Sequence, residues 1–161
     1  MKASHEMSEL FKIVLTSSIT VLSGILVFVG GQLIAKFFIE PIHEQRRLIG
    51  EIAHSLIFYA NLYSNPVLSK PERQNEAQKV LRRQACQLRE RTHVIPWYKL
   101  WQSLRVVIKY NDIEEASSHI IGLSNSVQTT PQLTQEMIDL TINDHIPRHV
   151  KKIKELLCIK F

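Results

Sequence analysis

Residues 13–35 read IVLTSSITVLSGILVFVGGQLIA, a run of 23 residues without a charge that lies between Lys12 and Lys36. At a rise of about 1.5 Å per residue, a helix of this length is about 34 Å long, enough to cross a hydrocarbon core of about 30 Å. The run is longer than the apolar region of a signal peptide and ends without a small-x-small cleavage pattern. We therefore expect residues 1–12 to be a short polar lead and residues 13–38 to be an uncleaved transmembrane helix.

The basic residues around this helix predict its orientation. Lys2 and Lys12 precede it, whereas Lys36, Arg46 and Arg47 follow it closely. Cytoplasmic flanks carry the excess of lysine and arginine, so this bias places the N-terminus outside and the rest of the chain in the cytoplasm.

Two features of the transmembrane helix predict contacts. An interfacial anchor is expected where a lysine that reaches the headgroups stands beside two aromatic rings, at Lys36, Phe37 and Phe38. Small residues fall on one helical stripe, at Ser17, Thr20, Gly24 and Gly31. Such a stripe lets backbones approach closely, so it is a candidate face for a homo-oligomer or another membrane protein, although small residues are also common in spanning helices without that role.

Residues 39–161 predict one all-α cytoplasmic domain, a bundle of five to six helices. After Pro41, which either kinks the helix or starts a new one, a helical stripe is expected at Ile49, Ile52, Ala53, Leu56, Ile57 and Ala60. The next helix is expected from Pro71 or Arg73 to about Thr92, with a buried face at Leu81, Ala85, Leu88, Thr92 and Ile95. Three further helices are expected from their buried stripes. These stripes are Ile113, Ala116, Ile120, Leu123 and Val127; Leu133, Met137, Ile138 and Leu140; and Val150, Ile153 and Leu157. Pro147 is expected to end the helix before the last one.

Two local signals add detail to this bundle. Asn111 and Asp112 offer an N-cap, with Glu115 placed as in a capping box. Gly50 costs about 1 kcal/mol within a helix relative to alanine, so we expect another helix to cross closely there.

The segment PWYKLWQSLRVVIKY, which begins at Pro96, is strongly amphipathic. Its apolar face comprises Trp97, Leu100, Trp101, Leu104 and Ile108. A basic helix with an aromatic face can lie in a membrane interface, and it can equally pack a helical core. We favour core packing, because a domain of this size needs its aromatic rings to bury apolar area.

The residues after Ala35 carry the whole formal charge of +5. The most basic segment supplies four candidate contacts to an anionic surface, Lys79, Arg82, Arg83 and Arg89. A solvated helix face is the favoured interpretation, ahead of contact with anionic lipid or an acidic partner. Nucleic acid is the least favoured partner, since no recognition motif accompanies these residues.

No catalytic or cofactor motif accompanies this fold. The glycine-rich phosphate loops, the nucleophile elbow and the CxxC pair are absent, and His145 and His149 have metal-ligand spacing but no accompanying HExxH glutamate. Cys86 and Cys158 are expected to be reduced structural residues. We therefore expect no enzyme, no metal and no cofactor.

Residues 36–66, KFFIEPIHEQRRLIGEIAHSLIFYANLYSNP, together with IGLSNS at residues 121–126, resemble a group of small bacterial single-pass membrane proteins of uncharacterised function. The resemblance implies a short anchor, a helical domain and a bacterial inner membrane, and it brings no site residue. The resulting hypothesis is a membrane-anchored interaction or scaffold protein that binds an unknown cytoplasmic protein. The alternative is a membrane-active effector whose transmembrane helices oligomerise and permeabilise the bilayer.

Overall fold

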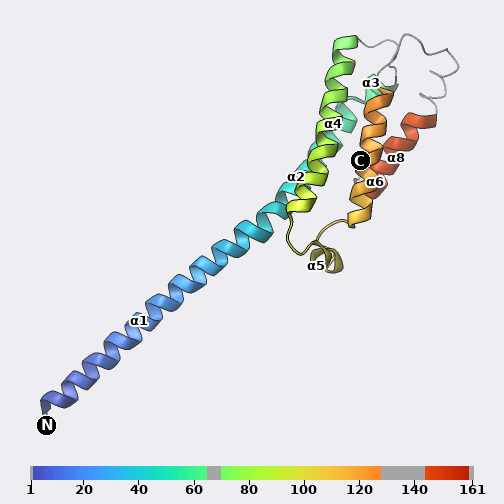
Figure 1. The fold of residues 1–161 in the computed structure, drawn as a ribbon. Coiled ribbons are helices and arrows are strands. Elements are labelled where there is room, and N and C mark those ends of the chain that lie inside the picture. The colour runs from blue at the N-terminus through green and yellow to red at the C-terminus, as the bar shows by residue number, and fades with distance from the viewer. Residues whose placement is uncertain (1, 65–69, 128–143, 160–161) are drawn as a thin grey trace. The chain divides into compact units, whose positions relative to one another are not determined.

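The structure, a computed structural model, describes residues 2–64, 70–127 and 144–159, with the backbone alone at residues 2–10 and 64. Within these ranges every regular element is a helix and no strand occurs, which confirms the all-α prediction (Figure 1). In chain order the elements are α1 (Lys2–Ile34), the π-helix η1 (Ala35–Ile39), α2 (Glu40–Phe58), α3 (Ala60–Ser64), α4 (Pro71–Val94), α5 (Tyr98–Ser103), α6 (Tyr110–Ser126) and α8 (Ile146–Leu156). The helix expected around Leu133, Met137, Ile138 and Leu140 lies outside the described residues.

The chain divides into two compact units, residues 1–40 and residues 41–161. The first unit contains the apolar run predicted from the sequence, and the described part of the chain has one helical stretch long and apolar enough to cross a bilayer. None of the most apolar window of this stretch is buried within the chain. The apolar side chains of this window are therefore not covered by the rest of the chain.

The helix resolves the two alternatives left open at Pro41. The Glu40 N–H bonds to the Ala35 carbonyl oxygen five residues back, which closes η1, and α2 begins at Glu40 with Pro41 in its first turn. Proline lacks an N–H, and the first turn is the position where a helix needs none. The helical stretch nevertheless runs without interruption from residue 11 to residue 58, so Pro41 lies within it, directly after the π-helix, and does not start a separate helix.

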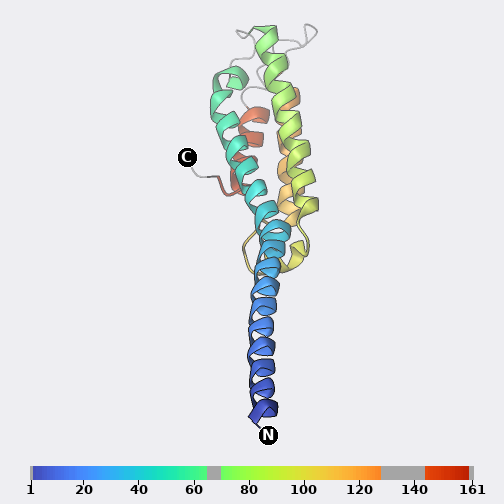
Figure 2. The same ribbon diagram turned by 90° about the vertical axis from the view of Figure 1, so that its left-hand side faces the viewer.

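The second unit is built on three packed helices and α2. α4 packs against α6, and α6 packs against α8, as Figures 1 and 2 show. The predicted stripes of α4 and α6 form much of the core, since Leu81, Ala85, Leu88, Ile113, Ala116, Ile120, Leu123 and Val127 are all buried. Pro71 begins α4 as expected, at a position where its missing N–H costs nothing.

Several local predictions are wrong. The buried face of α2 runs through Ile42, Leu48, Ile52 and Leu56, whereas Ile57 is 56% exposed. A side chain built at Gly50 would meet no atom within 4 Å, so none of the helices that the structure describes crosses closely there. The N-cap of α6 is Lys109, and the Tyr110 N–H donates to the Gln102 Oε1 at 3.1 Å, so Asn111 and Asp112 do not cap the helix.

The largest departure concerns the amphipathic segment. Only residues 98–103 form a helix, and the expected core side chains Trp97, Leu100 and Leu104 are 70%, 50% and 60% exposed. The prediction of core packing is therefore wrong for these three residues. No described helix of the second unit covers these three side chains, so the amphipathic pattern of the segment does not indicate a buried face here.

Candidate membrane and partner surfaces

The small residues of α1 lie on the surface of the first unit. Ser17, Thr20, Gly24 and Gly31 are all exposed, and side chains built at the two glycines would meet nothing within 4 Å. The Thr20 Oγ1 donates to the Thr16 carbonyl oxygen at 2.9 Å. The Thr20 proton is thus used within the helix, and the two glycines offer a neighbouring helix close backbone approach.

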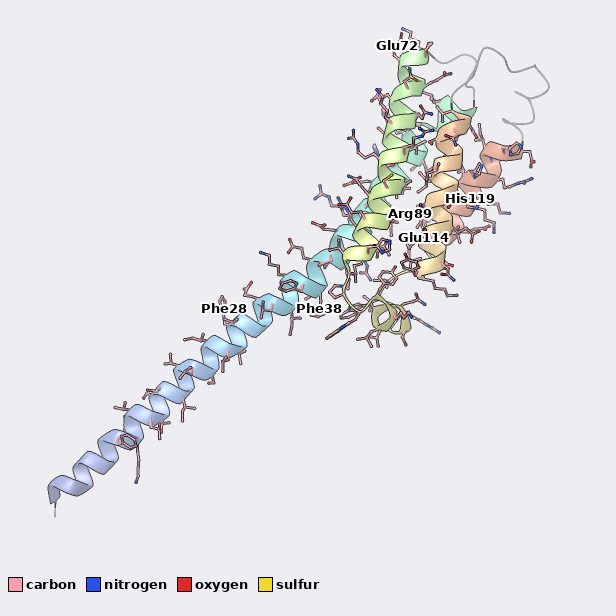
Figure 3. The ribbon with its side chains drawn as sticks, in the orientation of Figure 1. Phe28, Phe38, Glu72, Arg89, Glu114 and His119 are labelled. Carbon is pink, nitrogen blue, oxygen red and sulfur yellow. The ribbon has the colours of Figure 1, made fainter. Side chains whose placement is uncertain are left out.

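The predicted interfacial anchor falls inside η1. Lys36 and Phe37 are exposed and Phe38 is half-buried, and Figure 3 labels Phe28 and Phe38 on either side of the end of α1. A π-helix has a wider turn than an α-helix, and such turns often occur at functional sites. Lys36, Phe37 and Phe38 therefore lie at the one described irregularity in the helical stretch between residues 11 and 58.

The four basic residues predicted on α4 do not share one surface. Arg82 donates to the Asn125 Oδ1 at 2.7 Å, and Arg89 lies 3.3 Å from the Glu114 carboxylate and donates to the Ser118 hydroxyl at 3.2 Å. Figure 3 shows Arg89 of α4 and Glu114 of α6 facing one another. These two arginines connect α4 to α6, so they are structural contacts within the domain.

Lys79, Arg82 and Arg83 are all exposed, and of these three Arg82 bonds to Asn125 of α6. Lys79 and Arg83 are four residues apart on α4, and the exposed thiol of Cys86 follows three residues after Arg83, so Lys79, Arg83 and Cys86 share one helical face. Cys86 was expected to be a structural residue, and its exposure contradicts that expectation. This outer α4 face is one accessible basic surface of the domain.

A buried polar network joins α2, α4 and the segment after α4. Gln45 is 1% exposed, and its Nε2 donates to the Thr92 Oγ1 at 2.8 Å and to the Tyr98 hydroxyl at 3.3 Å. Tyr98 in turn donates to the Ile108 carbonyl oxygen at 2.7 Å. Burial raises the pKa of Tyr98, while the bond from Gln45 acts in the opposite direction. The sequence offered one signal for this network, because Gln45 stands midway between the buried Ile42 and Leu48.

Residues 97–105, which we call the tryptophan turn, are positioned by this network and by two further hydrogen bonds. Arg46 donates to the Val106 carbonyl oxygen at 2.7 Å, and the Trp101 indole N–H donates to the Pro96 carbonyl oxygen at 3.1 Å. Trp97 and Arg105 both have left-handed backbone angles, with φ of 52° and 56°. The turn is therefore held in a defined conformation although its apolar side chains face outward.

A cavity of about 510 Å³ opens beside the tryptophan turn. Val106, Val107, Ile108, Ile49 and Leu157 give it an apolar lining, and Arg46, Arg105, Lys109 and Asp112 contribute its charged groups. Three cations against one carboxylate favour an anionic occupant over a cationic one.

A histidine pair that the sequence did not predict lies between α6 and α8. The Nδ1 atoms of His119 and His149 are 2.8 Å apart, and Glu115 lies 3.7 Å from the opposite nitrogen of His119. Burial lowers the pKa of His149, and the charges of His119, His145 and Arg148 lower it further. Gly122 makes room for the His149 ring, since a Cβ at that position would lie 2.5 Å from its Cε1. Residues 30 positions apart carry no periodic signal that would have linked them.

Metal binding finds no support in this geometry. Among the residues that the structure describes, no group of three or more His, Cys, Asp or Glu side chains could hold a metal ion. His145 has metal-ligand spacing from His149 in the sequence, and in the structure it helps to lower the pKa of His149.

Comparison with known proteins adds no relative to these observations. No protein-family model matches the chain, and neither a curated protein nor a solved structure does so.

Proposed function

We propose that the protein is a single-pass membrane protein, in a bacterial inner membrane, whose helical domain binds another protein on the cytoplasmic side. The observation that carries this proposal is the apolar window of the helical stretch that includes α1, none of which is buried within the chain. Exposing that much apolar surface to water is costly, at about 25 cal/mol per Å², so a bilayer is the surrounding that suits it. The excess of basic residues after the helix supports a cytoplasmic domain.

The proposed role is binding without catalysis. The basic surface proposed for binding is the outer α4 face with Lys79 and Arg83, whereas Arg82 and Arg89 bond to α6. An acidic protein surface complements the outer α4 face, and electrostatic complementarity mainly sets specificity and association rate. Nucleic acid remains the less favoured partner, since these exposed cations do not extend into a recognition element.

Anchorage and orientation are tested together on native thiols. Cys86 and Cys158 are both exposed and free. The protein is expected to stay in membranes through an alkaline wash, and its thiols are expected to react with an impermeant maleimide only after the cells are permeabilised. Release by the wash would overturn the anchor, and labelling of intact cells would reverse the orientation.

Binding is tested from the same face. In a Cys158→Ser chain, a photo-crosslinker on Cys86 lies three residues from Arg83 and on the same helical face. We expect a discrete crosslinked protein that disappears in Lys79→Glu/Arg83→Glu and persists in Arg82→Gln. A chain that crosslinks to nothing, but whose expression collapses the membrane potential until Gly24→Leu is introduced, would instead support the membrane-active effector.

A further inference from the structure

We infer that the tryptophan turn, residues 97–105, inserts into the headgroup layer of an anionic bilayer and gives the chain a second membrane contact. This inference rests on the membrane anchorage proposed above, and it adds a specific segment and a specific lipid chemistry. The occupant of the exposed face is thus lipid rather than a protein partner.

The first argument is the kind of surface that the turn presents. Trp97, Leu100 and Leu104 follow helical spacing and are each half exposed or more, and Val94 at the end of α4 adds a fourth side chain at 63% exposure. Tryptophan is enriched at membrane interfaces, where its ring meets the apolar boundary and its indole N–H stays near polar groups. An exposed cluster of large apolar side chains on a small domain marks an interaction site.

The second argument is that the chain holds this surface outward at a cost. Left-handed backbone angles are unfavourable for residues other than glycine, and they occur at both Trp97 and Arg105, the two ends of the turn. Backbone strain of this kind gathers at functional sites because the surrounding structure must enforce it. Here the enforcing contacts are the bonds from Arg46 to the Val106 carbonyl and from Tyr98 to the Ile108 carbonyl.

The third argument is distance along the chain. Arg46, which holds the turn, comes eight residues after Phe38 of the predicted anchor. Eight residues span about 12 Å along a helix and at most about 29 Å when fully extended, whatever the angle between the two units. Figures 1 and 2 place α5 at the end of the helical domain where α2 begins, beyond the last turn of α4 and the first turn of α6. The turn therefore lies within reach of the bilayer surface.

The fourth argument is charge. Residues 94–109 contain Lys99, Arg105 and Lys109 and no acidic residue, and all three cations are exposed. Lysine and arginine side chains are attracted to an anionic leaflet. Lys109 and Arg105 also line the cavity beside the turn, together with Asp112 as its acidic group. Aromatic and aliphatic side chains beside cations are the chemistry of an interfacial segment.

The chain provides its own reporter, because its two tryptophans, Trp97 and Trp101, both lie in the turn. The full chain carrying Trp101→Phe is reconstituted into vesicles of equal parts phosphatidylcholine and phosphatidylglycerol. Part of the lipid carries bromine near the headgroup end of its acyl chains. We expect Trp97 to lose most of its emission to the brominated lipid and to be protected from aqueous iodide.

A matched reporter tests the position. In Trp97→Phe/Trp101→Phe/Phe58→Trp, the fluorophore replaces a residue of similar exposure, 58%, that follows Phe38 by twenty residues of helical chain. Twenty residues of helix span about 30 Å, against about 12 Å for the eight residues to Arg46, so we expect this reporter to be quenched less by lipid than Trp97 and to be more open to iodide. Equal quenching of both reporters, or of neither, would overturn the inference.

A charge variant tests the lipid chemistry. Lys99→Gln/Arg105→Asn removes two cations, and asparagine tolerates the left-handed backbone at position 105. We expect this variant in mixed vesicles, and the unchanged turn in phosphatidylcholine alone, to show a clear loss of Trp97 quenching. Quenching that is indifferent to both changes would overturn the anionic-lipid assignment.

The two proposals fail differently. Chains that resist the alkaline wash while Trp97 remains open to iodide would overturn the second contact alone, and would leave the turn as a face for a protein. Chains that the wash releases would overturn the membrane anchor itself.

Discussion

The Nδ1 atoms of His119 and His149 lie 2.8 Å apart, so the two rings share a single hydrogen bond across the contact between α6 and α8. One nitrogen must donate and the other must accept, so the pair is satisfied only while at least one ring is neutral. The pKa of His149 is lowered because burial, and then the neighbouring His119, His145 and Arg148, disfavour its charged form. The pair therefore links the packing of α8 to pH.

Acidification should destabilise the domain. The pKa of His149 in the folded chain lies below its ordinary value of 6.5, so the unfolded chain binds the proton more readily. The stability contributed by the neutral ring is thus present above about pH 6.5 and is lost as the pH falls through the folded-state pKa. Urea unfolding of the detergent-solubilised chain at several pH values measures this loss. His149→Gln, which cannot titrate, should flatten the slope, and an unchanged slope would contradict the assignment to His149.

Two glycine substitutions should have different effects on stability. Gly50→Ala meets no atom within 4 Å and should raise the free energy of unfolding by about 0.5–1 kcal/mol, because alanine is the better helix former. In Gly122→Ala the new methyl group would lie 2.5 Å from the His149 Cε1, so the ring must move and the bond to His119 is lost. Gly122→Ala should therefore bring no such gain. Thermal unfolding measures both, and equal stabilisation would show that His149 moves without loss.

Burial on α2 is tested by two isoleucines five residues apart. Ile52 is fully buried, so Ile52→Ala should lower the free energy of unfolding by about 2–5 kcal/mol. Ile57 is 56% exposed, and Ile57→Ala should change it by less than about 0.5 kcal/mol. A large effect at Ile57 in membranes but not in detergent would instead place that side chain against lipid or a partner.

The Gln45–Thr92 hydrogen bond should be measurable as a coupling. Gln45→Met removes the donor at nearly constant volume and should cost about 1–2 kcal/mol, since buried hydroxyls lose a partner. A double-mutant cycle with Thr92→Val should return a coupling of at least about 0.5 kcal/mol. Additive effects of the two substitutions would show that the bond contributes nothing by itself.

The salt bridge between Arg89 and Glu114 should contribute little. Both side chains are more than a third exposed, at 39% and 38%, so water screens the pair. Arg89→Gln should lower the free energy of unfolding by less than about 1 kcal/mol, as measured by urea titration. The same variant should leave the proposed Cys86 crosslink intact, whereas loss of that crosslink would make Arg89 a partner contact.

Helical periodicity predicted the core well where a helix has neighbours on one side. The stripes through Leu88 in α4 and Ile120 in α6 are buried as expected, because these two helices pack against each other. The same periodicity was misleading at Trp97 and Leu100, since an amphipathic face is equally suited to a core and to a membrane surface.

Contacts between distant residues escaped prediction for a different reason. The bond from Gln45 to Thr92 joins residues 47 positions apart, and the His119–His149 bond joins residues 30 positions apart. Neither residue type carries a local pattern that specifies its partner. The arginines show the same limit, because sequence grouped Arg82 with Arg83, whereas the fold turns Arg82 toward Asn125.

The uncovered apolar window has a consequence for the life of the protein in the cell. Since none of that window is buried within the chain, the folded domain gives it no shelter before it reaches a bilayer. A copy released into the cytosol would carry an uncovered apolar helix beside its folded domain. Such a form is prone to aggregation, chaperone binding and proteolysis. For a chain with the proposed membrane anchor, coupling synthesis to insertion would avoid that exposed form.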